Sequence, residues 1–330
     1  MPANLTQQYH KAEQFYRQAA TPEDELRCLQ DMLRELPKHK GTDKLQAELK
    51  QKISKAKKEV DSQSRSSKKG HGVRIPRQGA GRIVLIGAPN GGKSKLVGTL
   101  TRAEPDVAPY PFTTREPLPA MMPYEDVMVQ LIDTPPITRD VFQPYMQGLV
   151  RGADLVWFII DLGSDEGIDG VHEVYERFEQ TKTRLGTESH LDETDVGRSY
   201  TKTFVVFNKS DNPDSGLRRE LLTEFWQHRF TEYLVSAEQN TGLEQLRTDS
   251  YKSLDIVRVY PKQPTAKEPD FEKPFTLKRG ATLLEFAQLV HKDFANNLKF
   301  ARVWGSQVHD GTQVKSDYIP HDKDIIELHD

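Results

Sequence analysis

One eight-residue segment constrains this chain more than any other part of its sequence. Residues 87–94 read Gly-Ala-Pro-Asn-Gly-Gly-Lys-Ser and fit the pattern G-x-x-x-x-G-K-[ST]. The short β-branched run 82–86 before it predicts a buried strand, and the run 95–100 after it can open a helix. In such a unit the loop N–H groups and the positive end of the helix dipole point at one spot, which favours a phosphate. The segment therefore predicts a phosphate-binding loop, in which Lys93 reaches the β- and γ-phosphates and Ser94 holds Mg²⁺.

Taken alone, the segment 87–94 could be only a glycine-rich turn. A second motif argues against this alternative. Residues 203–207 form an apolar, strand-like run that ends in Asn208-Lys209-Ser210-Asp211. Ligands of open α/β sheets bind at this end of the strands. The Asp211 carboxylate can accept both N1–H and the exocyclic amine of guanine, a donor pair that adenine lacks. Asn208 would tie this loop to the phosphate loop, and the Lys209 stem would cover one face of the base. The two loops predict a guanine-nucleotide site made of Gly87, Ala88, Pro89, Asn90, Gly91, Gly92, Lys93, Ser94, Asn208, Lys209 and Asp211.

Three further segments are expected around the same nucleotide. The run 127–132 predicts a strand that delivers Asp133 at the Walker B position, where a carboxylate holds Mg²⁺ through water. The backbone of Ser236 and Ala237, after a short strand-like run, could contact guanine O6, although a motif this short means little alone. Residues 110–114, Tyr-Pro-Phe-Thr-Thr, occupy the place of a first switch segment.

In their order these motifs resemble translation-factor-class GTPases, and most closely the Obg branch that includes the developmentally regulated GTP-binding proteins. The resemblance rests on Gly-Ala-Pro-Asn-Gly-Gly-Lys-Ser, Tyr-Pro-Phe-Thr-Thr, Asn-Lys-Ser-Asp and Ser-Ala-Glu. It implies an α/β P-loop GTPase domain, with GTP or GDP as ligand and Mg²⁺ as cofactor. It also implies that Thr114 is the metal ligand of the first switch, with Thr113 the less favoured candidate. The implied metal ligands are Ser94, Thr114 and Asp133.

The second switch departs from the family pattern, which is Asp-x-Pro-Gly followed by more glycines. Here Pro136 holds the glycine position, and residues 137–140 contain no glycine. In this class the glycine N–H donates to the γ-phosphate, and proline has no N–H to donate. We therefore expect nucleotide binding to survive and GTP-dependent ordering of the switch to be weaker. Ile137 stands where other small GTPases carry a water-positioning glutamine, and Obg-like members also have a hydrophobic residue there.

The absence of that glutamine draws attention to Asn90. In GTPases with a hydrophobic residue at the glutamine position, an asparagine at this point of the loop can coordinate K⁺, which neutralises charge developing on the phosphates. Equally, Asn90 can simply stabilise the loop through its own backbone, as asparagine does in turns. The residues with an expected catalytic role are Lys93, Asn90 and Thr114.

Length and composition fit a multidomain protein of a reducing compartment. The chain has 330 residues, enough for two or more domains with a sizeable core. No apolar run is long enough to span a membrane, and the amino terminus lacks the charged start and apolar core of a signal peptide. Cys28 is the only cysteine, which excludes an internal disulfide. We expect a cytoplasmic location and no membrane partner.

The sequence before the phosphate loop divides into a helical region, residues 1–62, and a linker, residues 63–81. Helical leucine spacing after Pro22 and a second helix from near Thr42 predict an αα-hairpin. The linker region is rich in serine and glycine, and we expect it to be flexible. A mobile cationic arm suits a phosphate backbone such as ribosomal RNA, although a charge run is more often a solvated spacer. From residue 65 to the start of the next strand, the uncompensated cations are Arg65, Lys68, Lys69, Arg74, Arg77 and Arg82.

Residues 253–330 predict a separate, small α+β domain. One helix is expected over 283–290, and Arg279-Gly280 suggests the turn of a hairpin. The pattern predicts a ubiquitin-like (beta-grasp) fold and resembles a TGS domain, whose precedent implies RNA or ribosome contact; docking of a protein is the plainer alternative. Trp304 is expected in the core rather than on a base-stacking surface. The strand-like runs are 257–260, 275–277, 300–304 and 325–328, and the resembling residues are 277–282, 286–287, 291–293 and 301–305.

Two functional classes follow for a chain with its GTPase domain at residues 82–252. The first is a slow, Mg²⁺-dependent GTPase that acts as a switch on ribosome- or RNA-related processes. The second is a non-hydrolysing GTP/GDP-binding scaffold that docks protein or RNA through its TGS domain, for which Pro136 is the sequence argument. Asp211 argues against a third class, an adenine-specific ATPase.

Overall fold

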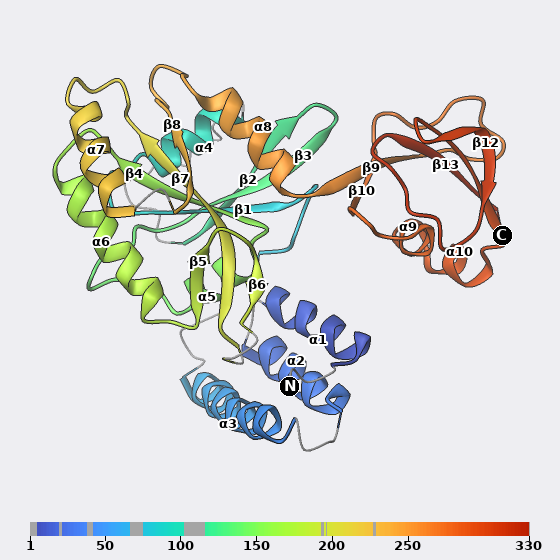
Figure 1. The fold of residues 1–330 in the computed structure, drawn as a ribbon, viewed down its shortest axis with the longest axis horizontal. Helices are drawn as coiled ribbons and strands as arrows, with labels where there is room; N and C mark the ends of the chain where they lie inside the picture. The colour runs from blue at the N-terminus through green and yellow to red at the C-terminus, as the bar shows by residue number, and fades with distance from the viewer. Residues whose placement is uncertain are drawn as a thin grey trace. The chain divides into compact units, whose positions relative to one another are not determined.

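The computed structural model describes residues 5–19, 22–37, 42–66, 75–101, 116–192, 195, 197–226 and 229–329. The chain divides into two compact units (Figure 1). The first comprises Met1–Pro76, Ile83–Ala120 and Leu131–Leu243, and the second comprises Arg77–Arg82, Met121–Gln130 and Glu244–Asp330. The division runs through strands β2 (Leu118–Tyr124) and β3 (Val127–Asp133), so the tip of this hairpin belongs to the second unit.

The larger sheet is mainly parallel and confirms the predicted α/β class. Its strand order is β2-β3-β1-β4-β7-β5, with β6 and β8 also paired to β7. Strand β4 is parallel to β1 and β7, and β7 is parallel to β5 and β8, whereas the short β6 is antiparallel to β7. The remaining strands are β1 (Arg82–Ile86), β4 (Leu155–Asp161), β5 (Thr183–Gly186), β6 (His190–Leu191), β7 (Ser199–Asn208) and β8 (Thr231–Leu234).

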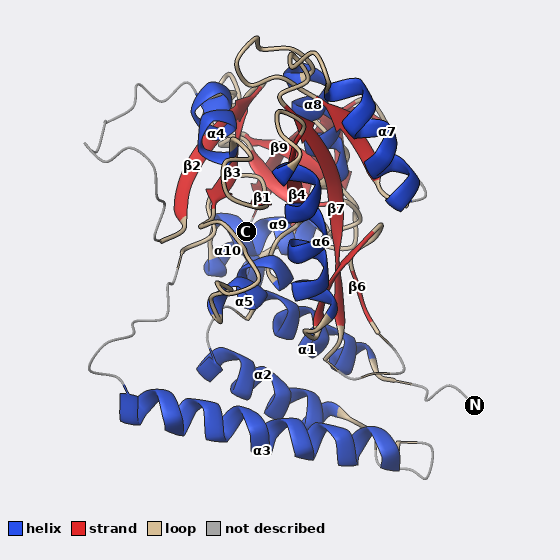
Figure 2. Cartoon of the chain, turned by 90° about the vertical axis from the view of Figure 1, so that its left-hand side faces the viewer, coloured by secondary structure: helices blue, strands red, loops and turns tan. Residues whose placement is uncertain are grey.

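Strands β1 and β4 are buried along their whole length, as expected for parallel strands covered on both faces. Alternate residues, such as Val84, Phe158 and Phe207, join one hydrophobic core with helices α5 (Tyr145–Arg151), α6 (Glu166–Glu179) and α7 (Ser215–Trp226). Figure 2 shows α5 and α6 lying along the strands. The burial of these apolar faces fixes the strand order on which the site depends.

The carboxyl ends of the parallel strands carry the predicted motifs. Strand β1 leads into the phosphate loop and helix α4 (Lys93–Thr101), and β3 ends at Asp133. Strand β7 ends at Asn208, and β8 is followed within two residues by Ser236. Because the carboxyl ends of parallel strands meet at one edge of a sheet, the fold gathers these residues together.

The amino-terminal region contains three described helices where the sequence pattern predicted two. The expected hairpin is α2 (Pro22–Glu35) with α3 (Asp43–Ser66), and α1 (Gln7–Gln18) packs against α2 as well. Thr6 caps α1 by accepting the N–H of Tyr9. The three helices share a core of their own, in which Tyr9, Leu29 and Leu49 are almost fully buried.

These helices attach to the sheet-containing part of the first unit through Arg151, the last residue of α5. Its guanidinium donates to the backbone oxygen of Ala19 and to the Glu25 carboxylate at 3.0 Å, and lies over the ring of Tyr16. Leu191 packs against the same helical core. The acidic segment 187–195 thus contributes a residue to this attachment.

The second unit contains a five-stranded sheet in the order β10-β9-β13-β11-β12. Helices α9 (Leu283–Val290) and α10 (Lys292–Asn297) pack on it, and Thr282 with Glu285 forms a capping box for α9. The turn at Arg279-Gly280 connects β10 to α9 and not two strands, because β10 pairs with β9; the hairpin expected at this turn was wrong. The strands are β9 (Ile256–Pro261), β10 (Phe275–Lys278), β11 (Phe300–Gly305), β12 (Val308–Val314) and β13 (Asp324–His329).

Trp304 is partly exposed and lies outside the buried core of this sheet, contrary to expectation. The Lys262 ammonium lies 4.9 Å from the centroid of the indole. On β11, residues 301 and 303 point into the core, so period-two alternation turns residue 304 to the opposite face.

Arg82 corrects the predicted basic arm. It begins β1, is 4% exposed, and donates from Nε to the Gln130 side chain at 2.9 Å, so it is not one of the cations of a mobile linker. Residues 67–74, with Lys68, Lys69 and Arg74, lie outside the described residues, as does the side chain of Arg65.

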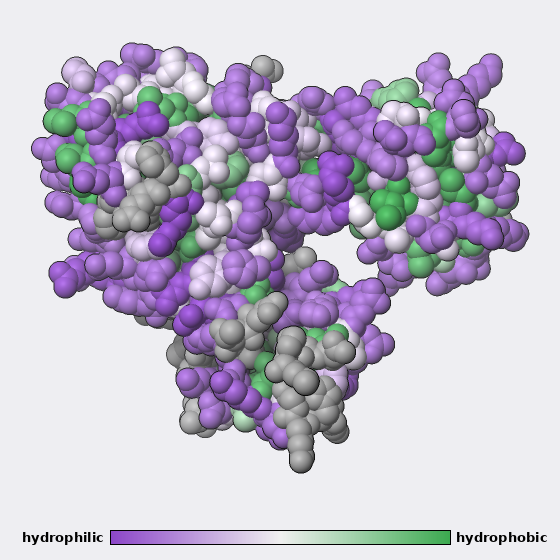
Figure 3. Space-filling view, viewed as in Figure 1, coloured by the Kyte–Doolittle hydropathy of each residue, from purple (hydrophilic) through white to green (hydrophobic). Residues whose placement is uncertain are grey.

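The visible surface of Figure 3 is mainly hydrophilic, with scattered small hydrophobic patches. Among the described helices, none combines the length and apolar character needed to cross a membrane.

Candidate nucleotide-binding site

The phosphate loop depends on glycine at two positions. Gly92 has φ +84°, and a Cβ there would lie 2.4 Å from the amide nitrogen of Asn208. A Cβ on Gly87 would lie 2.4 Å from the backbone oxygen of Ile159 on β4. Real Cβ contacts are never this close, so the loop packs against its neighbours only with glycine at these positions.

Lys93 lies inside the loop that it is expected to serve. Its ammonium donates to the backbone oxygens of Gly87 at 3.1 Å and Ala88 at 2.8 Å, and the residue is 7% exposed. Burial lowers the pKa of Lys93 to about 8, partly offset by the Asp133 carboxylate. The cation is therefore held where phosphates would arrive, in surroundings that penalise its charge.

Ser94 and Asp133 meet although 39 residues separate them in sequence. The Ser94 hydroxyl donates to Oδ2 of Asp133 at 2.5 Å, and Asp133 is 4% exposed. Mg²⁺ prefers such oxygen ligands and takes most of its other ligands from water and phosphate, so this pair fits the ion. Thr113 and Thr114 lie outside the described residues.

Asn208 connects the three loops of the site, as predicted for the phosphate loop. Its amide nitrogen donates to the Gly91 oxygen at 2.9 Å, and its amide oxygen accepts the N–H of Ala237 at 3.1 Å. The N–H of Ser236 donates to Thr241. A guanine O6 at this turn would have to share or replace the bond between Ala237 and Asn208.

Asp211 is oriented by a hydroxyl. Ser236 Oγ donates to Oδ1 of Asp211 at 2.5 Å and accepts the N–H of Gln239 at 3.0 Å. The residue is exposed, and its carboxylate keeps acceptor capacity on both oxygens beyond the bond from Ser236, so it can still accept the two donors of a guanine.

The second switch has few backbone donors. Pro135 and Pro136 have no N–H. The N–H of Ile137 donates to the Gly87 oxygen at 3.1 Å, and that of Thr138 donates to Val141. Residues 135–138 therefore offer a γ-phosphate no uncommitted backbone N–H in this arrangement.

Asn90 lies at the exposed tip of the phosphate loop with φ +59°. Asparagine tolerates this left-handed conformation better than most residues, which agrees with a role in loop geometry. The side chain is exposed and stays available to a cation, so both interpretations of Asn90 stand.

Sequence reasoning missed the residues around Lys209. The Lys209 ammonium pairs with Asp161 at the end of β4 at 2.7 Å, and Arg218 of α7 donates to the Leu162 oxygen and to Asn212. Asp161 could have been identified from sequence, because it is a carboxylate at the carboxyl end of an apolar strand, as Asp133 is.

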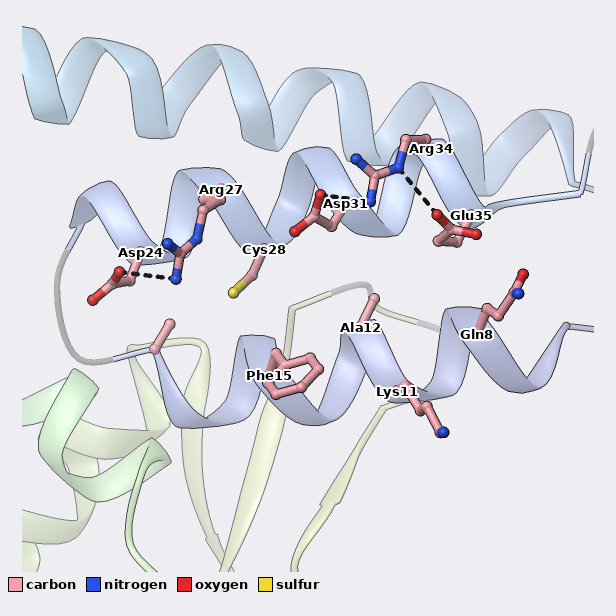
Figure 4. A pocket seen from close by; sticks show the side chains of 11 residues that line it. Gln8, Lys11, Ala12, Phe15, Asp24, Arg27, Cys28, Asp31, Arg34 and Glu35 are labelled. Carbon is pink, nitrogen blue, oxygen red and sulfur yellow. Dashed lines mark hydrogen bonds and ion pairs between the residues drawn. The ribbon is translucent and has the colours of Figure 1, made fainter. Parts of the chain in front are cut away.

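A groove of about 600 Å³ lies elsewhere in the first unit, between α1 and α2 (Figure 4). Phe15 is 64% exposed on one wall, and Cys28 is buried on the other. Along α2, Arg27 pairs with Asp24, and Arg34 pairs with Asp31. These charges neutralise one another, so the groove is not a phosphate site comparable to the loops above.

Comparisons with known proteins found matches to both parts of the chain. Residues 82–209 match the family model described as "50S ribosome-binding GTPase", and residues 257–328 match that of the TGS domain. The uncharacterized GTP-binding protein MJ1326 of Methanocaldococcus jannaschii is 28% identical over 93% of this chain and 92% of its own. Developmentally-regulated G-protein 2 of Arabidopsis thaliana is 26% identical over 82% of this chain and 81% of its own. A crystal structure of a GTP-binding protein from Pyrococcus horikoshii aligns with a TM-score of 0.46 at 13% identity, covering 75% of this chain and 99% of that one.

The chain thus carries a GTPase domain followed by a TGS domain, and its relatives include proteins named developmentally-regulated G-proteins.

Proposed function

We propose that this GTP-binding protein is a slow, Mg²⁺-dependent GTPase that switches a ribosome- or RNA-related process. The observation that carries the proposal is the contact between Ser94 and Asp133 beside the buried Lys93. These three groups would hold Mg²⁺ and the β- and γ-phosphates, and the ion would neutralise charge developing on the transferred phosphoryl group. K⁺ at Asn90 would contribute to the same neutralisation.

Base selection is proposed to depend on Asp211, which Ser236 orients. Asn208 links the phosphate end and the base end of the proposed site, since its side chain contacts both the phosphate loop and the turn that carries Ala237. A ligand that fills one end should therefore stabilise the other.

The second candidate is a GTP/GDP-binding scaffold without significant turnover. It is favoured by the second switch, where Ile137 donates to Gly87 and Pro136 has no donor. A switch with these bonds would respond weakly to the γ-phosphate, and the nucleotide would then act mainly as a structural ligand.

A ribosomal or RNA partner is proposed from the TGS domain and from the name of the matching GTPase family. The TGS domain, with Arg77 and the cations before it, would supply the contacts, and a protein partner remains the plainer alternative. A cytoplasmic location follows from this proposal.

Steady-state GTP hydrolysis separates the two candidates. The full-length protein is assayed with and without ribosomes, with Mg²⁺ or EDTA, and in K⁺ or Na⁺. A GTPase switch predicts Mg²⁺-dependent turnover that ribosomes increase, and a K⁺ site predicts faster turnover in K⁺. Turnover no higher than that of Lys93→Ala under all conditions, with GDP still bound by the wild type, would favour the scaffold.

A further inference from the structure

Asp161 is not among the residues proposed to contact the nucleotide, but its carboxylate pairs with Lys209, which is one of them. It is the last residue of β4, and its side chain is 6% exposed. One carboxylate oxygen accepts the N–H of Gly163 at 2.7 Å, and the other accepts the ammonium of Lys209 at 2.7 Å. Both oxygens of a buried carboxylate are therefore engaged, and Lys209 supplies the compensating charge.

Lys209 needs such support because its backbone conformation is unfavourable. It has φ +63°, the left-handed region that lysine seldom adopts. The backbone on either side is fixed, since Leu162 donates to the oxygen of Asn208, and the N–H of Ser210 donates to Val235. The ion pair with Asp161 then fixes the far end of the side chain, so the aliphatic stem is held at both ends.

Gly163 provides a second observation on the same contact. A Cβ at this position would lie 2.8 Å from Cδ of Lys209 and 2.9 Å from Oδ1 of Asp161. The chain therefore passes so close to the ion pair that only glycine fits without moving the lysine stem.

We propose that Asp161 is a positioning residue for base recognition, which holds the Lys209 stem against the face of the purine. This inference rests on the proposed guanine-nucleotide site. A lysine stem that is already ordered loses less conformational freedom when a base packs on it, so the ion pair should increase affinity through pre-organisation.

The test is titration of the full-length protein with GDP and with guanosine, which lacks phosphates. Asp161→Asn keeps the shape and removes the charge, and we expect both ligands to bind about 3- to 10-fold more weakly, by the same factor. The matched control is Asp165→Asn. Asp165 is four residues away and 88% exposed, and it pairs with Arg218 rather than with Lys209, so affinity should stay within about twofold.

A double-mutant cycle distinguishes positioning from a general effect on folding. If Asp161 acts through Lys209, Asp161→Asn has no further effect on guanosine affinity in a Lys209→Met background. If Asp161→Asn proves unstable by circular dichroism, Gly163→Ala takes its place, because it displaces the stem and keeps both charges.

Three results would overturn the inference. They are additive effects in the cycle, unchanged affinity in Asp161→Asn, or tighter binding in that variant, which would mean that the pair competes with the nucleotide. A wild-type protein that binds neither GDP nor GTP would instead overturn the proposed function, so the two failures are distinguishable.

Discussion

The backbone N–H of Ile137 donates to the carbonyl oxygen of Gly87, with an N···O distance of 3.1 Å. This bond joins the second switch to the first residue of the phosphate loop. Ile137 is 1% exposed and belongs to the core under the sheet, so a shift of its backbone toward a phosphate would disturb that core. The N–H of Ile137 is therefore a poor substitute for the donor that Pro136 lacks.

Pro136→Gly should restore a γ-phosphate donor and raise the preference for GTP over GDP. A hydrogen bond to a charged group contributes about 1.5–3 kcal/mol, so the preference should rise roughly tenfold or more. Calorimetric titration of both nucleotides measures it. Pro135→Ala is the matched control, because it adds an N–H one residue away from the glycine position. A wild type that already prefers GTP strongly, with no change in Pro136→Gly, would show that the proline is accommodated.

Asp211→Asn should exchange guanine for xanthine specificity. The amide presents a donor to guanine N1–H, and such a mismatch of buried polar groups costs several kcal/mol, on the order of a thousandfold in affinity. Competition between GDP and XDP for the protein measures the exchange. Ser236→Ala should show a smaller loss of GDP without a gain of XDP, since Ser236 only orients the carboxylate. Undiminished GDP affinity in Asp211→Asn would remove Asp211 from the site.

Sequence periodicity and motifs predicted the strands that carry the site, because each motif is local and follows a buried apolar run. Strand β1 begins and ends where the predicted β-branched run does, and Asn208 contacts the phosphate loop as expected. Three features escaped prediction because they depend on partners distant in sequence. From sequence, Arg82 resembles the linker cations, because its partner Gln130 lies 48 residues away. The turn at Gly280 resembles a hairpin turn, because the pairing of β10 with β9 is not visible in the local sequence. Asp161 gives no indication of its ion pair, because Lys209 follows another strand, β7.

Nucleotide binding should be accompanied by proton uptake at alkaline pH. Burial lowers the pKa of Lys93 from 10.5 to about 8, so the amine is largely neutral at pH 9. Phosphates beside it favour the charged form and raise that pKa, so binding takes up a proton between about pH 8 and 10. Titration calorimetry with GDP at pH 9 in two buffers of different ionisation enthalpy measures the uptake. Lys93→Met should bind GDP more weakly and lose the uptake, whereas equal uptake in both proteins would assign it to another group.

The lowered pKa of Lys93 also predicts how the free energy of unfolding depends on pH when no nucleotide is added. The unfolded chain binds the Lys93 proton more tightly than the folded chain does, so the unfolded state carries more protons between pH 8 and 10.5. This group therefore lowers stability below pH 8, and its contribution improves as the pH rises to 10.5. Lys93→Met should remove that dependence, which urea unfolding at pH 7 and pH 10 can detect. Parallel pH curves for the two proteins would mean that Lys93 is charged in the free site.

Arg258 should be the main polar determinant of stability in the second unit. Its side chain is 5% exposed and donates to Asp126 and Asp322, each at 2.7 Å, and to Glu125 on the hairpin tip. Breaking a buried ion pair costs about 3–5 kcal/mol, but these carboxylates are partly exposed and can regain water. We therefore expect Arg258→Ala to lower the free energy of unfolding by about 2 kcal/mol. Arg279→Ala is the control, since its pair with Asp255 is exposed on both sides and should contribute less than about 0.5 kcal/mol.

The destabilisation caused by Arg258→Ala should depend on pH, because the substitution leaves the carboxylates around Arg258 without their cation. Burial alone would raise the pKa of Asp322, but the hydrogen bonds from Arg258 more than offset this, and the pKa lies below 3.8. A carboxylate whose pKa is lowered by folding contributes stability above its unfolded pKa and loses it as the pH falls through the folded value. The difference between wild type and Arg258→Ala should thus be complete at pH 7 and shrink below pH 3.8. Denaturant unfolding, followed by the indole N–H NMR signal of Trp304 as a probe of this unit, measures the difference at each pH. A difference that stays constant down to pH 3 would mean that Arg258 stabilises the unit by packing against Tyr251, whose ring lies 5.6 Å from its guanidinium carbon, and not through charge.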